Sequence, residues 1–218
     1  MRSLALDRFD PPFESVLCLG AHPDDIEIGC AGAILRLAQA PKPPLFTWVV
    51  FSSDAVRKDE ARRSAEALLR DTTNPRIRIE QFRDGFLPYE GARVKEVFEG
   101  LKSTTSPDLV FTHYRNDLHQ DHRLISELTW NTFRDHWILE YEVPKYDGDL
   151  GAPNVFVPLA EPLCRRKIEA ILQGFPSQHG KRWFSEDVFR SLLRLRGVEC
   201  NTSGGHAEAF YCRKLVLG

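Results

Sequence analysis

The sequence lacks three features that would each point to a particular class of protein. Its 29 Lys and Arg residues nearly balance 31 Asp and Glu residues, and the net charge of −2 gives no electrostatic support for a nucleic-acid or membrane-surface partner. No apolar run reaches the roughly 18 residues of a membrane span. Gly29 and Gly32 do not complete a G-x-G-x-x-G motif, so the dinucleotide-binding fingerprint is absent as well. We therefore expect neither nucleic acid nor a membrane among its partners.

Cysteines are few and scattered. There are five, an odd number, and no two form a C-x-x-C pair, which argues against a zinc knuckle and against a disulfide framework. Free thiols of this kind fit a reducing compartment. Near the amino end, Asp7, Arg8 and Asp10 interrupt the chain before a secretory apolar segment could form. Together these features predict a cytoplasmic protein.

Short apolar runs alternate with helical patterns over the first two thirds of the chain. The expected strands are 15–21, 45–53, 76–82 and 108–113, and the expected helices are 29–40, 56–70, 92–102 and 120–133. Repeated strand–helix units favour parallel strands joined by right-handed crossovers. The pattern predicts an α/β fold of the Rossmann-like, doubly wound type, with a mainly parallel sheet and helices on both faces.

From about residue 137 the pattern changes. Two strand-like pieces within 138–159 flank a turn region rich in Gly, Pro and Asp, and helices at 161–174 and 186–195 precede a closing strand at 206–217. We find no internal repeat and no linker, and 218 residues of which 42% are hydrophobic can bury one sizeable core. We expect a single domain over 1–218, with a core of about 14–136 and a substrate-side elaboration of about 137–218.

Two segments place ionisable side chains directly after expected strands. "HPDD", residues 22–25, follows the first strand, and "HYRNDLHQDHR", residues 113–123, includes the end of the fourth. Ligands of open α/β sheets bind beyond the carboxyl ends of the strands. His119 and His122 are three residues apart near the start of a helix, so both can face one crevice.

These residue types suit metal chemistry. One histidine and one carboxylate from the first segment, with one histidine from the second, would make the kind of three-ligand set that catalytic zinc sites use. The remaining carboxylate could take a proton from water, and the remaining imidazole could stabilise an oxyanion. Each segment alone also has an ordinary explanation, because an H-x-x-H pair arises by chance and acidic loops are common. Their joint occurrence after two parallel strands favours the metal site.

"AHPDDIEIGCAGAI" and "DLHQDHR" closely resemble the paired motifs of the PIG-L/LmbE family of zinc-dependent N-deacetylases, which act mostly on N-acetylglucosamine-type sugars. The resemblance includes "PSQHG" and "AEAF" and spans nearly the whole chain in motif order. It implies that His22, Asp25 and His122 bind one Zn²⁺ per chain, with other divalent ions possible. It also implies that Asp24 is the catalytic base and that His119 polarises the carbonyl or protonates the departing amine.

Further assignments surround this set. Asp121, next to His122, would orient an imidazole without binding the metal itself, and we expect the same role for Asp117. Five residues are assigned to substrate binding, namely Arg57, Glu27, Asp84, Ser177 and Gln178. Three of them also have a structural reading: Arg57 lies on a helix face that could be solvated, Glu27 could hold the loop backbone, and Asp84 begins an Asp-Gly turn that needs no ligand.

The activity implied by the resemblance is removal of the acetyl group from the N-acetyl amine of a small amino-sugar or glycoconjugate substrate, through zinc-bound water with Asp24 as general base. One alternative is a metal-dependent amidohydrolase acting on a non-sugar amide, such as an acylated natural product. Another is a binding module that has lost its chemistry, which the presence of all five motif residues disfavours. A homo-oligomer is compatible with the sequence. The roles of the 140–155 loop, His206 and Glu208 stay open, and His113 is expected to be packed.

Overall fold

The computed structural model describes residues 6–8, 10 and 12–216. Its seven-stranded sheet has the order β3-β2-β1-β4-β5-β7-β6. The strands are β1 (Ser15–Gly20), β2 (Leu45–Ser52), β3 (Arg76–Phe82), β4 (Leu109–His113), β5 (Trp137–Tyr141), β6 (Val155–Leu159) and β7 (His206–Tyr211). The first five are parallel, and β7 runs antiparallel between β5 and β6. The mainly parallel sheet expected from the sequence is confirmed.

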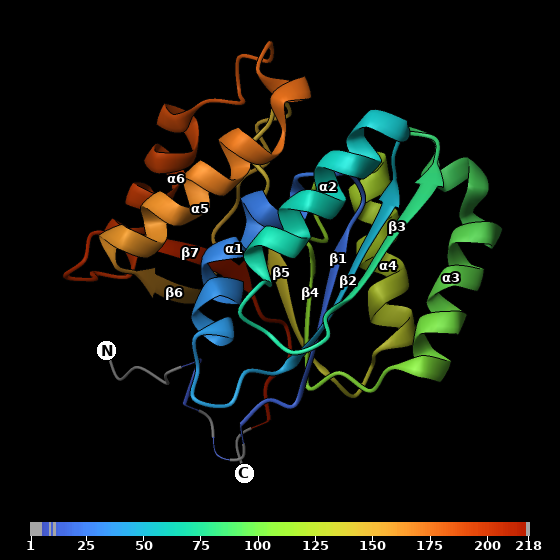
Figure 1. Ribbon diagram of the computed structural model, residues 1–218, viewed down its shortest axis with the longest axis horizontal. Coiled ribbons are helices and arrows are strands. Elements are labelled where there is room, and N and C mark those ends of the chain that lie inside the picture. Colours follow the sequence, from blue (N-terminus) through green and yellow to red (C-terminus); the bar gives the residue numbers. More distant parts are fainter. Residues whose placement is uncertain (1–5, 9, 11, 217–218) are drawn as a thin grey trace.

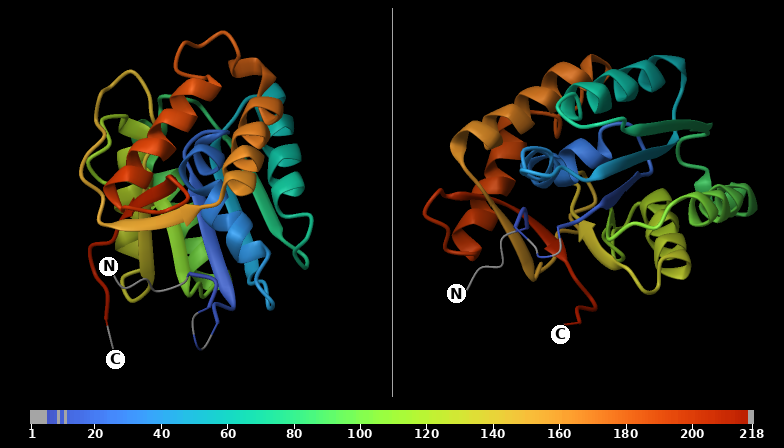
Figure 2. Two further views of the ribbon diagram at one scale, coloured as in Figure 1. Left: turned by 90° about the vertical axis from the view of Figure 1, so that its left-hand side faces the viewer. Right: turned by 60° about the horizontal axis from the view of Figure 1, so that its bottom comes forward.

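Helices cover both faces of the sheet, as expected for a doubly wound fold (Figures 1 and 2). One face carries α1 (Asp25–Ala38), α2 (Ala55–Leu68), α5 (Glu161–Gly174) and α6 (Glu186–Glu199), and the other carries α3 (Gly91–Thr104) and α4 (Gln120–Thr132). Strands from both the 14–136 part and the 137–218 part join one sheet. The boundary between core and elaboration stays a prediction.

The central strand β1 shows why the sheet forms. Side chains of successive strand residues point to opposite faces, and a parallel strand covered on both sides must be apolar throughout. Val16 and Cys18 pack into the apolar cluster under α1, α2, α5 and α6, whereas Leu17 and Leu19 pack into the cluster under α3 and α4. All four side chains are fully buried. This rigid strand fixes the position of the loop that follows it.

The helix α1 begins at Asp25, four residues before the expected start at 29. Gly29 and Gly32 both lie inside the helix rather than before it. A Cβ at Gly29 would overlap the Tyr141 ring, and a Cβ at Gly32 would overlap the Leu159 side chain. These glycines therefore allow α1 to approach the sheet closely, and the acidic residues before them occupy the first helical turn.

Other boundaries differ at the carboxyl end. The closing strand β7 ends at Tyr211 rather than at 217: residues 212–216 form no strand, and residue 217 lies outside the described part. Its pairing with β5 reaches only Glu140 and Tyr141, so the chain leaves the sheet at that point. The helix α6 extends to Glu199, four residues beyond its expected end.

Three features of the chain bear on where the protein is located, namely its helices, its cysteines and its amino end. In the part of the chain that the structure describes, no helix combines the length and the apolarity needed to cross a bilayer. All five cysteines are free thiols, and three of them are buried. The expectation that the amino end holds no secretory segment rests partly on residues 1–5, 9 and 11, which lie outside the described residues.

Candidate active site

The loop between β1 and α1 presents the first acidic pair at the carboxyl edge of the sheet. Asp24 adopts a φ of 92°, in the left-handed region that non-glycine residues rarely occupy, and forms the N-cap position of α1. The Asp25 carboxylate accepts a hydrogen bond of 2.6 Å from the backbone N–H of His22. Both carboxylates are buried. Burying two acidic groups away from water costs free energy, which other contacts of the fold must offset.

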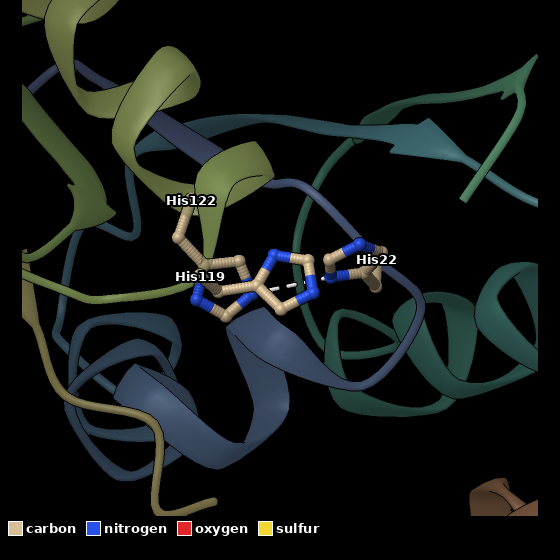
Figure 3. A group of neighbouring side chains, drawn as sticks. All are labelled: His22, His119 and His122. Atoms are coloured by element: carbon tan, nitrogen blue, oxygen red, sulfur yellow. Dashed lines mark hydrogen bonds between the residues drawn. The ribbon is translucent and has the colours of Figure 1, made fainter. Parts of the chain in front are cut away.

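His22, Asp25 and His122 meet at one point. The Nδ1 of His22 lies 3.1 Å from the Nε2 of His122, and Asp25 oxygens lie 3.4 Å and 3.5 Å from these two nitrogens. Ligand atoms bound to zinc at about 2.0–2.1 Å in a tetrahedron are about 3.4 Å apart. The three residues therefore have the identity and the spacing of ligands that share one ion. Figure 3 shows the His22 and His122 rings directed toward each other beside His119.

Other side chains reach the same point. His119 completes a second three-histidine group with His22 and His122, in which one nitrogen from each lies within 4.8 Å of the others. His113, at the end of β4, is fully buried with its Nε2 3.2 Å from an Asp25 oxygen. That same Nε2 accepts a hydrogen bond of 2.9 Å from the backbone N–H of Ala21, so its lone pair is already used. His113 is thus packed, as expected, and it touches a candidate ligand.

Carboxylates hold the far nitrogens of both candidate ligand histidines. The Nε2 of His22 lies 3.1 Å from Asp121, and the Nδ1 of His122 lies 2.9 Å from Asp117. Such outer contacts fix which nitrogen of a ring faces a metal. Asp121 was expected to orient an imidazole and does contact one, but that ring belongs to His22 and not to its neighbour His122. Asp121 also accepts hydrogen bonds from the backbone N–H groups of Gly85 and Leu87.

The charges of the group favour a cation. Burial would lower the pKa of His22, but the carboxylates of Asp25, Asp121 and Asp84 outweigh burial and raise it well above its usual value. Burial, with His113 nearby, lowers the pKa of His122 to about 3. The carboxylates around His22 therefore favour a positive charge at this point, and His122 offers a neutral nitrogen to an ion. The donor set fits a divalent metal.

Asp24 lies beside this set and is suited to proton transfer. Burial raises the pKa of its carboxyl group to about 7, although the guanidinium of Arg57 opposes that rise. The Arg57 Nη2 lies 2.9 Å from an Asp24 oxygen and also donates to the backbone carbonyl of Pro23. A carboxyl group with a pKa near neutrality can both accept and return a proton.

His119 precedes α4 and caps it. Its Nδ1 accepts a hydrogen bond of 3.2 Å from the backbone N–H of Asp121, so in the neutral ring the proton lies on Nε2. Burial, together with the positive charge of His22, lowers the pKa of His119. The ring therefore offers an N–H donor to the pocket.

A pocket of about 310 Å³ opens over these residues. Of the five residues assigned to substrate binding, Arg57, Asp84 and Gln178 line it. Glu27 does not line it: only 1% of Glu27 is exposed, and burial raises the pKa of its carboxyl group to about 8. Ser177 is also outside the lining, because its N–H and its hydroxyl both donate to Glu60 on α2. That contact holds the turn from which Gln178 projects.

The far wall of the pocket was not assigned from the sequence. It consists of Lys145, Tyr146, Asp147, Lys181 and Trp183, together with Val143. Lys145, Tyr146 and Asp147 belong to the 140–155 loop, whose role the sequence left open. Lys181 and Trp183 lie between α5 and α6. The aromatic residue soon after "PSQHG" was the one sequence signal that could have indicated this part of the wall.

His206 and Glu208 do not line the pocket. Glu208 is buried beneath α1, where its carboxylate accepts hydrogen bonds from the backbone N–H groups of Gly32 and Ala33 and pairs with Lys167 at 2.6 Å. These contacts join β7, α1 and α5. Glu208 therefore has a structural role, which the sequence left open.

Comparison with known proteins gives one family and several similar structures. The model of the PIG-L family, described as GlcNAc-PI de-N-acetylase, matches residues 17–133. N,N'-diacetylchitobiose deacetylase from Pyrococcus horikoshii is 23% identical, with a TM-score of 0.69 over 92% of this chain and 84% of that one. GalB, the 4-carboxy-2-hydroxymuconate hydratase from Pseudomonas putida KT2440, is 16% identical, with a TM-score of 0.70 over 94% and 98%. A triple mutant of a deacetylase in the teicoplanin biosynthetic pathway is 17% identical, with a TM-score of 0.71 over 91% and 97%.

The structural similarities confirm the fold. Because deacetylases and a hydratase share it, the fold does not choose the reaction. The family match is more specific, since it covers more than half of the chain and includes both the "HPDD" and the "DLHQDHR" segments. On this match, the chain belongs to the PIG-L family.

Proposed function

We propose that the protein is a zinc-dependent deacetylase that hydrolyses the N-acetyl group of an amino-sugar-containing small molecule or glycoconjugate. The observation that carries the proposal is the convergence of His22, Asp25 and His122 on one point, with Asp24 beside them. The description of the family as a de-N-acetylase supports it. Deacetylases among the similar structures support it as well, including the one named for N,N'-diacetylchitobiose.

In this proposal one divalent ion binds to His22, Asp25 and His122. It would supply Lewis-acid polarisation of the acetyl carbonyl and acidify an adjacent water molecule. Asp117 and Asp121 hold the two imidazole rings in the orientation that such binding needs. The native ion is zinc in our proposal, because two imidazoles and one carboxylate with room for a further ligand are typical of catalytic zinc sites.

Asp24 takes the proton of the attacking water. Arg57 holds the Asp24 carboxylate in place and favours its ionised form, which is the form that accepts a proton. The Nε2–H of His119 stabilises negative charge on the acetyl oxygen during attack. Asp24 or His119 then protonates the departing amine, and acetate and the free amine leave.

The pocket wall matches a ring that carries hydroxyl groups. Trp183 and Tyr146 provide aromatic faces, and Asp84, Lys145 and Gln178 provide hydrogen-bonding groups. A volume of about 310 Å³ is near the lower end of ligand sites, which suits one sugar unit with the rest of the substrate outside. We assign substrate contacts to these residues and to Arg57, and no longer to Glu27 or Ser177.

Metal analysis and acetate release test the proposal together. Purified protein is expected to contain about one zinc per chain in the candidate site and to release acetate from one class within a panel of N-acetylated sugars, sugar nucleotides, glycosides and conjugated amines. Asp24→Asn is expected to retain the metal and to lose turnover by at least about a hundredfold. Undiminished turnover in that variant contradicts the role of Asp24.

Other outcomes of the same panel identify the alternatives. Acetate or another acid released only from non-sugar amides indicates the amidohydrolase alternative. Tight sugar binding without hydrolysis indicates a binding module. The free state of all five cysteines supports our proposal of a reducing, cytoplasmic location, and a homo-oligomer stays a prediction that gel filtration can test.

A further inference from the structure

A second group of metal-binding side-chain types lies where α5 meets β7, outside the pocket of the candidate active site. Glu161 and Cys164 belong to the first turn of α5, and His206 is the first residue of β7. One possible ligand atom from each of the three lies within 4.8 Å of the others. We propose that Glu161, Cys164 and His206 bind a second divalent ion of the zinc type, which joins α5 to β7.

The backbone brings these residues together without any induced movement of the helices. His206 pairs with Leu159 at the end of β6, and α5 starts two residues after Leu159. The imidazole therefore lies beside the corner between strand and helix. Glu161 and Cys164 are three residues apart on that helix, so their side chains share one face.

The nitrogen of His206 is unsatisfied in this arrangement. Its Nδ1 is buried and has no hydrogen-bond partner among the described residues, and an Oε2 of Glu161 at 3.6 Å is the ionic group closest to it. A buried polar atom without a partner costs free energy, typically about 1–3 kcal/mol. The Cys164 sulfur is fully buried and accepts a long hydrogen bond of 3.9 Å from the Arg190 guanidinium. A metal ion would give the His206 nitrogen the partner it lacks and would bind the sulfur more strongly than this long hydrogen bond does.

The ligand types select the ion. Thiolate and imidazole bind zinc, cobalt and related metals, whereas magnesium and calcium require mainly oxygen ligands. Glu161 is the one oxygen ligand in the cluster. The side chain of Glu161 is 46% exposed, so the fourth position of a tetrahedral ion faces solvent and can hold water.

Arg190 on α6 competes with the ion for Glu161. Its guanidinium lies 3.2 Å from a Glu161 oxygen and 3.1 Å from a Glu186 oxygen. Glu186 remains as a partner when Glu161 turns toward a metal, and the Arg190 side chain is 32% exposed and can follow. Removal of this positive charge is expected to strengthen ion binding, which separates a metal site from a simple ion-pair network.

Cobalt is a suitable probe because a cobalt–thiolate bond gives an intense near-ultraviolet absorption band, and the described lining of the candidate active site contains no cysteine. Cobalt titrated into the full, metal-free protein is expected to reach two equivalents per chain and to develop that band. Cys164→Ser should lose the band and one equivalent, while Cys200→Ser, which alters a thiol elsewhere, should keep both. His122→Gln should keep the band, because it affects only the other site.

Two further variants keep the test decisive if Cys164→Ser folds poorly. His206→Gln retains the thiol and is expected to weaken binding at this site by more than about tenfold. Arg190→Ala is expected to tighten it. A single equivalent of cobalt without a thiolate band in the wild-type protein overturns the proposal, as does a band that survives Cys164→Ser or disappears in Cys200→Ser. Failure of the deacetylase proposal leaves this test unaffected, since its readout is spectroscopic.

Discussion

Asp117 holds His122 through a hydrogen bond of 2.9 Å between its carboxylate and the Nδ1 of the ring, which leaves Nε2 directed at His22. The same carboxylate accepts a hydrogen bond of 2.9 Å from the Nζ of Lys145. One acidic residue therefore connects a candidate metal ligand to the loop that forms the far wall of the pocket. Metal affinity and pocket shape both depend on it.

Asp117→Asn is expected to weaken zinc binding by about 10–100-fold, because a neutral amide no longer stabilises the orientation and basicity of the His122 ring. Competition with a chelator of known affinity measures the change. Asp149→Asn is the matched control, since Asp149 contacts the same Lys145 at 2.5 Å but touches no imidazole. Equal losses in the two variants would show that the loop, and not the ring, determines affinity.

Arg57→Gln is expected to move the acid limb of the pH–rate profile to higher pH. The guanidinium favours the ionised form of Asp24, and its loss raises the pKa of a carboxyl group that must be ionised to accept a proton. The pH dependence of kcat/KM for acetate release measures the shift. Lys58→Gln removes the neighbouring charge, whose amine contacts Gln81, and should leave the limb in place. A limb that stays unchanged in Arg57→Gln would remove Asp24 as the titrating group.

Lys167→Met is expected to lower the free energy of unfolding by about 3–5 kcal/mol, because it leaves the Glu208 carboxylate buried without its cation. Lys167 also donates 2.6 Å hydrogen bonds to Glu208 and to the carbonyl of Ile28. Urea denaturation measures the loss. Lys42→Met is the matched control: Lys42 and Glu14 form a pair at 3.7 Å with side chains 70% and 78% exposed, and its loss should cost less than about 1 kcal/mol.

If Lys167→Met unfolds the protein, the double variant Lys167→Met/Glu208→Gln provides a second measurement. Removal of both charges should cost less than the sum of the single losses, because no uncompensated charge is left. Additive losses would mean that the two side chains act independently, which their contact contradicts.

Glu27→Gln is expected to reduce the pH dependence of stability. Burial raises the pKa of the Glu27 carboxyl group from its ordinary value of 4.5 to about 8. The folded protein therefore keeps a proton that the unfolded chain releases, and this stabilisation is complete below about pH 4.5 and lost as pH rises through about 8. The variant has no proton to lose, so its stability relative to wild type should rise by about 2–4 kcal/mol between pH 5 and pH 8. Urea denaturation at both pH values measures it.

Glu66→Gln, at an exposed position of α2, is the control for this measurement and should follow the wild-type pH dependence. Glu27 lies two residues from the candidate ligand Asp25, so both proteins are compared with the same metal content. A pH dependence in Glu27→Gln equal to that of wild type would show that Glu27 is ionised in the folded protein.

The local sequence pattern was sufficient to predict most of the secondary structure and to identify the motifs that hold the candidate ligands. Apolar periodicity depends on neighbouring residues alone, so β1, β2, β3 and α4 were predicted within two residues of their ends. The two acidic and histidine-rich segments could be placed together because parallel strands end at one edge of a sheet. His22 and His122 do meet there, across a hundred residues of chain.

Tertiary packing decided the contacts between distant residues, which no local sequence pattern encodes. The close approach of Gly29 to Tyr141 depends on another strand, and the partner of Asp121 is His22 and not its sequence neighbour. Lys181 and Trp183 reach the pocket from the connection between α5 and α6. Periodicity tells which face of a segment is buried but not which distant segment covers it. The sequence by itself determined the elements and the chemistry of the candidate ligands, whereas long-range packing determined their orientation and the wall around them.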